Sequence, residues 1–157
     1  GVRLDLRDGA AVRASWAAMM TEVAAKAPRA RLHGALVSPM LKGGVETVLG
    51  MTRDPVFGPL IMFGLGGAFV EVFRDVGFRL APLEREEALR LVRSIKGFPL
   101  LDGARGKPKA DLGALAEALV ALSRFAEAHP EAASIEVNPF IALPEGGHGL
   151  DAVILRG

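Results

Sequence analysis

The stretch VETVLGMTRDPVFGPLIMF, residues 45–63, decides the fold, because it joins two strand-forming runs through a turn. Residues 45–52 are rich in apolar and β-branched residues, and PLIMF, residues 59–63, forms a second apolar run. Between them lies RDPVFG, in which Asp54 precedes Pro55 and Gly58 closes the segment. These residues are typical of a turn, so the second run is predicted to return antiparallel to the first.

Further helices and strands are predicted on both sides of this hairpin. Apolar side chains recur at helical spacing, and Asp8 and Asp111 stand where a helix N-cap is expected. The predicted helices are residues 10–26, 84–95 and 112–129. The predicted additional strands are Val2–Leu6, residues 31–41 and residues 68–82, the last as one strand or a strand pair. A closing hairpin is predicted at 134–155. Strands and helices come in blocks, which favours the α+β class, with a mainly antiparallel sheet covered by helices.

The composition argues against several classes of function. Half of the residues are hydrophobic and the net charge is +1, with no basic patch interleaved with aromatic residues, so nucleic acid is not an expected partner. The absence of cysteine excludes disulfides and thiol catalysis and fits a cytoplasmic protein. The uncharged run at residues 55–70 is shorter than the roughly 20 residues of a membrane-spanning helix. Nothing at the N-terminus resembles a signal peptide. Because the chain has no initial methionine, it is expected to be part of a longer protein.

Three oxygen-bearing side chains of the closing hairpin, Glu136, Asn138 and Asp151, are predicted to converge on one face. Glu136 and Asn138 are two positions apart and therefore lie on one face of a strand. A type I turn over residues 143–146 pairs Leu143 with Gly146 and places Asn138 opposite Asp151; a glycine bulge would shift this register by one residue. Two carboxylates and an amide oxygen are suitable ligands for Mg²⁺. The alternative is an exposed hairpin face with ordinary polar residues.

Two other features could contact phosphate. The glycines of GLGG, Gly64, Gly66 and Gly67, would let backbone amides approach an anion, although they match no Walker A or GxGxxG motif and could form a tight connection between strands. Arg53 could reach a phosphate from a strand end, or pair with Asp54, or face water. No histidine has a partner at ligand spacing and no Ser/His/Asp arrangement stands out, so no catalytic residue is assigned.

Residues 43–83, followed by SIKGFPLLDGARG and EVNPF…LDA, resemble the C-terminal portion of the ATP-grasp region of NDP-forming acyl-CoA synthetases. That family includes ADP-forming acetyl-CoA synthetase and is related to succinyl-CoA synthetase. The resemblance implies an ATP-grasp architecture, with residues 1–34 as the end of the first subdomain and residues 35–157 as the second. It also implies that Asn138 and Asp151, with Glu136 alongside, hold Mg²⁺, and that Arg53, Gly64, Gly66 and Gly67 lie on the phosphate side of ATP or ADP.

The reaction implied by the resemblance couples acyl-CoA, phosphate and ADP to ATP and the free acid. It proceeds through a phosphohistidine that belongs to another domain or subunit, which also binds CoA, and no histidine here matches it. The nucleotide-contacting lysine of the family would precede this chain, so the ATP-grasp unit is expected to be incomplete and the isolated chain inactive. The alternative function is a non-catalytic, synthetase-like regulatory module, for example of a protein lysine acetyltransferase.

Overall fold

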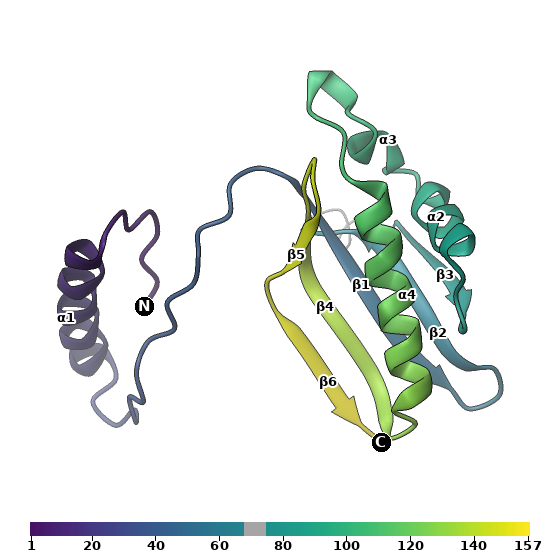
Figure 1. Ribbon diagram of the computed structural model, residues 1–157. Coiled ribbons are helices and arrows are strands. Elements are labelled where there is room, and N and C mark those ends of the chain that lie inside the picture. The colour runs from purple at the N-terminus through teal and green to yellow at the C-terminus, as the bar shows by residue number, and fades with distance from the viewer. Residues whose placement is uncertain (68–74) are drawn as a thin grey trace. The chain divides into compact units, whose positions relative to one another are not determined.

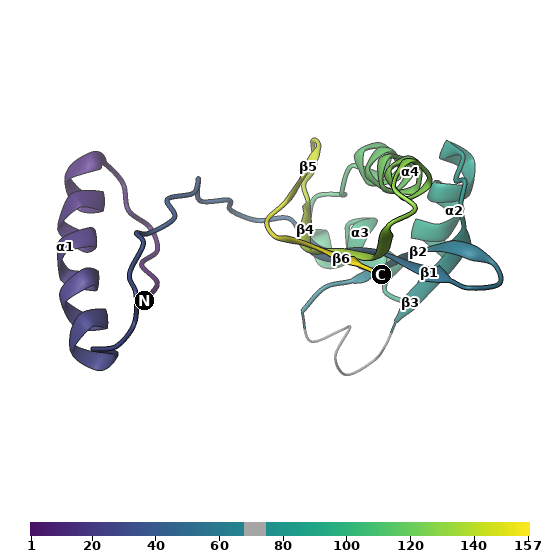
Figure 2. The same cartoon turned by 90° about the horizontal axis from the view of Figure 1, so that it is seen from below.

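The computed structural model describes residues 1–67 and 75–157, and the chain divides into two compact units, residues 1–42 and residues 43–157 (Figures 1 and 2). None of the helices in these described residues is long and apolar enough to cross a membrane. The assignment of residues 1–34 and 35–157 to two subdomains stays a prediction.

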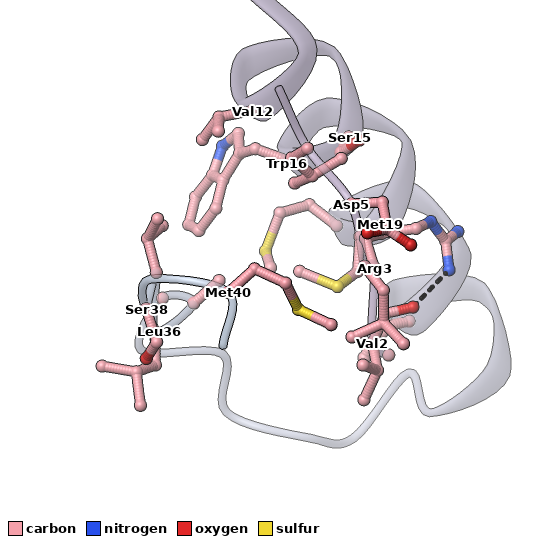
Figure 3. Close-up of a pocket in the computed structure, with 18 of the residues that line it drawn as sticks. Val2, Arg3, Asp5, Val12, Ser15, Trp16, Met19, Leu36, Ser38 and Met40 are labelled. Atoms are coloured by element: carbon pink, nitrogen blue, oxygen red, sulfur yellow. Dashed lines mark hydrogen bonds between the residues drawn. The ribbon is translucent and has the colours of Figure 1, made fainter. Parts of the chain in front are cut away.

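The first unit is built around helix α1 (Gly9–Lys26). The Asp8 carboxylate caps it as predicted, accepting a hydrogen bond of 2.8 Å from the Ala11 N–H. No residue of α1 is buried. The helix and two extended segments instead surround an apolar hollow of about 740 Å³, toward which Trp16, Met19 and Met40 turn (Figure 3). Large apolar side chains of this unit therefore remain accessible to water, as the 93% exposure of Leu36 illustrates.

Two predicted strands in this unit, Val2–Leu6 and residues 31–41, are wrong, because both segments are irregular in the structure. Alternating or apolar residues give a segment the capacity to form a strand, but a strand exists only where a neighbour supplies its hydrogen bonds. Within residues 1–42 neither segment has such a ladder.

Among the described residues, six strands form an antiparallel sheet in the second unit, in the order β3-β2-β1-β4-β5, with β6 also paired to β4. The hairpin of β1 and β2 matches the sequence prediction, with Asp54 paired to Gly58 at its turn. Asp54 Oδ1 accepts hydrogen bonds from the N–H groups of Val56 and Phe57, at 2.8 and 2.9 Å, which stabilises the turn. The strands are β1 (Val45–Asp54), β2 (Gly58–Leu65), β3 (Val76–Leu80), β4 (Ala132–Ala142), β5 (Gly147–Gly149) and β6 (Ala152–Arg156). The first part of the predicted strand at 68–82 lies outside the described residues.

The helices of this unit are α2 (Arg85–Ser94), the short α3 (Phe98–Leu101), the 3₁₀ turn η2 (Ala104–Gly106) and α4 (Leu112–Ala128). The two longer helices confirm the sequence predictions, and Asp111 caps α4 through a 3.0 Å hydrogen bond from the Ala114 N–H. Helices α2 and α4 contact each other and lie on the same side of the sheet (Figure 2). The α+β fold with a helix-covered antiparallel sheet is therefore confirmed.

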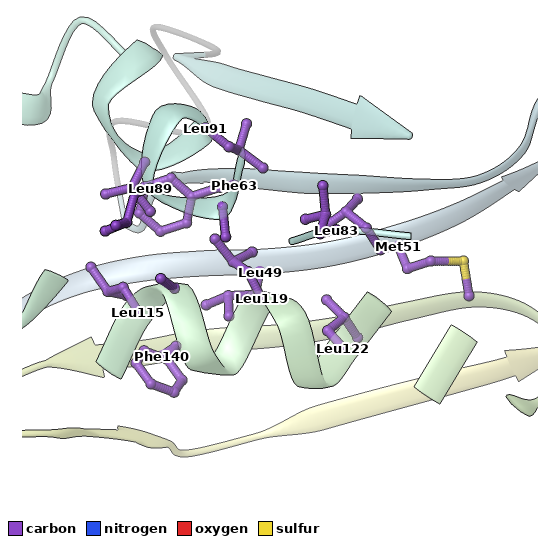
Figure 4. Close-up of a cluster of buried hydrophobic side chains, with 14 of the residues drawn as sticks. Leu49, Met51, Phe63, Leu83, Leu89, Leu91, Leu115, Leu119, Leu122 and Phe140 are labelled. Carbon is purple, nitrogen blue, oxygen red and sulfur yellow. The ribbon is translucent and has the colours of Figure 1, made fainter. Parts of the chain in front are cut away.

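The core lies between these helices and the sheet (Figure 4). Leu115 and Leu119 of α4 are completely buried against Leu49 and Phe63 of the central strands. Burying one such side chain stabilises the fold by about 1.5–3 kcal/mol.

Alternation along the strands separates this core from the opposite face of the sheet. Leu49 and Ile135 belong to the core, so their neighbours Gly50 and Glu136 point to the other side. Within the described part of residues 43–157, no helix covers that second face. The candidate site therefore lies on the open face of the sheet.

Candidate functional site

A β-bulge in β4 lies at Asn138–Pro139. Against β1, Phe140 pairs with Thr47 and Val137 pairs with Leu49, so two residues of β4 oppose Val48 alone. Pro139 has no N–H to donate, and a bulge is where a central strand tolerates it. The Thr47 hydroxyl, which is buried, donates a 2.7 Å hydrogen bond to the Phe140 carbonyl and so ties the two strands together next to the bulge.

On the opposite edge of β4 the register is the one predicted from the turn. The Leu143 N–H donates to the Gly146 carbonyl at 3.1 Å, and the Asn138 N–H donates to the Asp151 carbonyl at the same distance. The pairs between these two, such as Ile141 with His148, keep one unbroken register. Asn138 therefore lies directly opposite Asp151, and no glycine bulge intervenes in this part of the hairpin.

The three predicted side chains come together at a hollow of about 220 Å³ on the open face. The Asn138 Nδ2 donates a 2.9 Å hydrogen bond to Glu136 Oε1, and Asp151 Oδ1 accepts a 2.9 Å bond from the Ala152 N–H. Because a carboxylate only accepts, the amide nitrogen must face Glu136, and the amide oxygen is what Asn138 can offer a cation. The residues around the hollow are Ser134, Glu136, Asn138, Asp151, Ala152, Val153 and Leu155.

This donor set suits a hard cation. Two carboxylates and an amide oxygen match Mg²⁺, which binds to one or two carboxylates and fills its remaining positions with water and phosphate. In residues 1–67 and 75–157, no group of three or more histidine, aspartate or glutamate side chains is placed to hold a metal. A cation in this hollow would therefore need oxygen ligands from a substrate or from water, as a nucleotide-bound Mg²⁺ does.

Gly64 lies at the same level of the sheet as these ligands. It pairs with Val48, and Val48 faces the bulge at Asn138–Pro139. At a strand spacing of about 4.8 Å, the Gly64 backbone is about 10 Å from that of Asn138. The GLGG segment and the metal candidates thus occupy one end of the open face.

Two of the GLGG glycines have structural contacts of their own. The Gly66 N–H donates a 2.7 Å hydrogen bond to the Glu46 carbonyl, which extends the ladder between β1 and β2. A Cβ on Gly64 would lie 2.9 Å from the Asp75 carbonyl oxygen, so glycine permits the close approach of β3. The rest of the connection to β3, from residue 68 to residue 74, lies outside the described residues, so both the tight connection and the phosphate role of these glycines stay predictions.

Arg53 is placed apart from the other candidates. Its guanidinium donates to two carbonyls at the end of α4, those of Ala126 and His129, and to that of Ala132 at the start of β4, at 2.7–3.1 Å. It stands five residues along β1 from Val48, the partner of Gly64, about 16 Å at 3.3 Å per residue. Its side chain bonds to α4 on the helix side of the sheet, whereas the metal candidates lie on the open face. The structure therefore does not bring Arg53 together with the glycines or with the metal candidates.

Two aspartates that support this end of the molecule were not singled out as site residues by the sequence. Asp75 accepts hydrogen bonds from the N–H groups of Lys96 and Gly97, at 2.8 and 2.6 Å, and so fixes the loop after α2 to the start of β3. Asp111 was recognised as a helix cap, but its second carboxylate oxygen also accepts from the Gly146 N–H at 3.0 Å. Both contacts join residues far apart in the chain, so no local sequence signal marks them.

Comparisons with known proteins show the family of the chain. The ATP-grasp domain family matches residues 1–155. The chain is 41% identical over its whole length to 23% of the acetate–CoA ligase [ADP-forming] I of Archaeoglobus fulgidus. The chain is also 40% identical to the beta subunit of acetate–CoA ligase [ADP-forming] I of Pyrococcus furiosus. That match includes 97% of this chain and 66% of the beta subunit.

A solved structure is similar as well. It is the acetyl-coenzyme A synthetase 1 of Ca. Korarchaeum cryptofilum in complex with coenzyme A and Mg-AMPPCP. The match includes all of this chain and 68% of the solved chain, with a TM-score of 0.86 and 38% identity. In that structure the phosphohistidine segment points towards the nucleotide-binding site. The chain thus spans about a quarter of the first relative and about two thirds of the second relative and of the solved chain.

Proposed function

Because the chain belongs to the ATP-grasp family, in its branch of ADP-forming acyl-CoA synthetases, we propose that it forms the magnesium–nucleotide side of such an enzyme. The observation that carries the proposal is the direct opposition of Asn138 and Asp151 on the open face, with Glu136 beside them. These residues would hold the metal that accompanies ADP and ATP.

The protein's own part in the reaction is to bind and orient the nucleotide. In a synthetase of this kind the phosphoryl group passes from a phosphohistidine of another domain to ADP, so that an N–P bond breaks and an O–P bond to the terminal ADP oxygen forms. Bound Mg²⁺ would neutralise the negative charge on the phosphate oxygens. Asn138 and Asp151, anchored by the hydrogen bond between their backbones, keep their ligand oxygens in one place.

The GLGG segment is proposed to lie along the phosphates. Its distance of about 10 Å from Asn138 leaves room for a phosphate chain and one cation between them. The Gly66 N–H is engaged by Glu46, and the space beside Gly64 and Gly66 is filled by Asp75 and Glu46, so these two glycines are proposed to bring the strands close together beneath the phosphates. Arg53 is proposed to contribute through its positive charge at a distance, since its Nε and Nη2 groups bind carbonyls.

The apolar hollow of residues 1–42 supports a separate packing unit at the N-terminal end of this chain. Val2, Leu4 and Leu36 are 63–93% exposed beside this hollow, and so much accessible apolar surface is typical of a face that packs against another part of a protein. We propose that residues 1–34 are the end of the first ATP-grasp subdomain and that residues 35–157 are the second. A domain or subunit that binds CoA and carries the phosphohistidine is the proposed partner.

The relatives described above are named as ligases or synthetases, and these comparisons give no support to the alternative of a non-catalytic regulatory module. That alternative is therefore not proposed.

The test is calorimetric titration of Mg–ADP into the full-length protein that carries this chain, together with its Asn138→Ala variant. We expect the variant to lose Mg–ADP binding and acyl-CoA-dependent ATP formation while its melting temperature stays close to that of the parent. Thr52→Ala is the matched control, because Thr52 is exposed on the same face but does not line the hollow. Unchanged binding in Asn138→Ala would overturn the proposed site.

A further inference from the structure

Asp111 holds the closing hairpin at its turn. Its Oδ1 accepts a hydrogen bond from the Ala114 N–H and its Oδ2 accepts one from the Gly146 N–H, each at 3.0 Å. Its own N–H donates to the Leu143 carbonyl at 2.7 Å. One residue therefore starts helix α4 and contacts both ends of the turn between β4 and β5.

The turn leads directly to the candidate metal ligands. Asp151 is five positions from Gly146, and Asn138 is five positions from Leu143, about 16 Å along each strand. The β5 ladder that joins them has three residue pairs, and two of its three residues on the β5 side are exposed. A slip of one residue in this ladder would turn side chains to the opposite face of the sheet.

Asp151 lies between two ladders and depends on both. On one side, Ala152 of β6 pairs with Val137. On the other side, the Leu150 N–H donates to the Pro139 carbonyl at 2.9 Å, and this bond continues the register of β5. The β6 ladder fixes the chain after Asp151, whereas the chain before it is fixed through β5 and the turn.

We propose that Asp111 is a positioning residue for the metal site: by holding Leu143 and Gly146 it keeps β5 in register and Asp151 opposite Asn138. This inference rests on the proposed function of that site. Asp111 contacts neither Asn138 nor Asp151, so it acts through the hairpin. The hydrogen bonds from Gly146 and Ala114 lower the pKa of Asp111, so near neutral pH both of its oxygens accept.

Asp111→Asn separates the two contacts of the side chain. Asparagine is as good an N-cap as aspartate, so its single oxygen can keep the bond to Ala114. Its NH₂ group would then face the Gly146 N–H, donor against donor, and the hold on the turn would be lost. In the full-length protein we expect the Kd for Mg–ADP and the Mg²⁺ concentration for half-maximal turnover each to rise about tenfold, within the usual range of coupling between sites.

Ser123→Ala is the matched control for a loss of stability alone. Ser123 is also on α4, and its hydroxyl accepts a 2.9 Å hydrogen bond from the Leu83 N–H, away from the hairpin. Each variant thus removes one hydrogen bond that a side chain of α4 or of its N-cap accepts from a distant backbone N–H. A weaker Mg–ADP affinity in Asp111→Asn at a melting temperature similar to that of Ser123→Ala supports the inference, and equal affinities in the two variants overturn it.

Two further variants complete the test. If Asp111→Asn does not fold, Asp111→Ser, which also keeps a helix cap, is measured in the same way with the same criteria. Asn138→Ala is titrated in parallel. If Asn138→Ala loses Mg–ADP binding but Asp111→Asn binds Mg–ADP as the parent does, only the role of Asp111 is overturned. If Asn138→Ala binds Mg–ADP unchanged, both the proposed metal site and this inference are overturned.

Discussion

Asn138 and Asp151 face each other across the last hairpin of the sheet, joined by a 3.1 Å hydrogen bond from the Asn138 N–H to the Asp151 carbonyl. Their backbones are therefore fixed by the sheet itself, while both side chains remain exposed on the open face. A rigid backbone beneath accessible oxygen ligands is what a site for a metal–nucleotide complex requires, because the ligands need no rearrangement when the complex arrives.

Asp151→Asn tests the charge of this pair. The substitution keeps the size of the side chain and an oxygen ligand but removes one negative charge from a set of two carboxylates. We expect the Mg²⁺ concentration for half-maximal nucleotide binding to rise by about tenfold or more, since hard cations depend on ligand charge. The measurement is Mg²⁺ titration at fixed ADP in the full-length protein. Glu145→Gln, which removes an exposed charge at the turn, is the control, and an equal response of both variants would contradict a local role for Asp151.

The register of this pair was predictable because it depends on local chemistry. Pro144 and Gly146 define a turn, and a turn of known length fixes every pair behind it. The helix caps at Asp8 and Asp111 and the turn at Asp54 were predictable for the same reason, since each bond spans only two or three residues.

Contacts between distant segments were not predictable in this way. The bulge at Asn138–Pro139 arises only against β1, whose residues lie some 90 positions earlier in the chain, as the Thr47–Phe140 hydrogen bond shows. The second contact of Asp111, with Gly146, spans 35 positions. The incorrect strands at 2–6 and 31–41 have the same origin, because a pattern of side chains cannot tell whether a partner strand is present.

Arg53→Lys distinguishes a structural role for Arg53 from a phosphate-binding one. Lysine keeps the positive charge but cannot span the carbonyls of Ala126, His129 and Ala132 as the guanidinium does. We expect the free energy of unfolding to fall by about 1.5–3 kcal/mol, as for loss of hydrogen bonds to a charged group. The Kd for Mg–ADP should be unchanged when measured well below the melting temperature. Parental stability with weaker nucleotide binding would instead assign Arg53 to the phosphates.

Acid should weaken the turns held by Asp54 and Asp111. Backbone N–H donors lower the pKa of both carboxyl groups, mainly those of Phe57 and Val56 for Asp54 and of Gly146 and Ala114 for Asp111. A group whose pKa is lower in the folded state contributes stability above its unfolded pKa, near 3.9, and loses it as pH falls through the folded value. The urea midpoint should therefore decrease below about pH 4, and less steeply in Asp111→Asn. Identical slopes in parent and variant would contradict this account.

Leu119→Ala tests whether the α4 contact holds the sheet that carries the site. Leu119 is completely buried and packs in the core that contains Leu49 and Phe63. Removing its side chain should lower the free energy of unfolding by about 2–5 kcal/mol, from the lost burial and the cavity that remains. Urea denaturation followed by circular dichroism measures the loss. Glu117→Ala, at an exposed position of the same helix, should change it by less than about 0.5 kcal/mol. If the two variants unfold at the same urea concentration, α4 is not packed on the sheet as described.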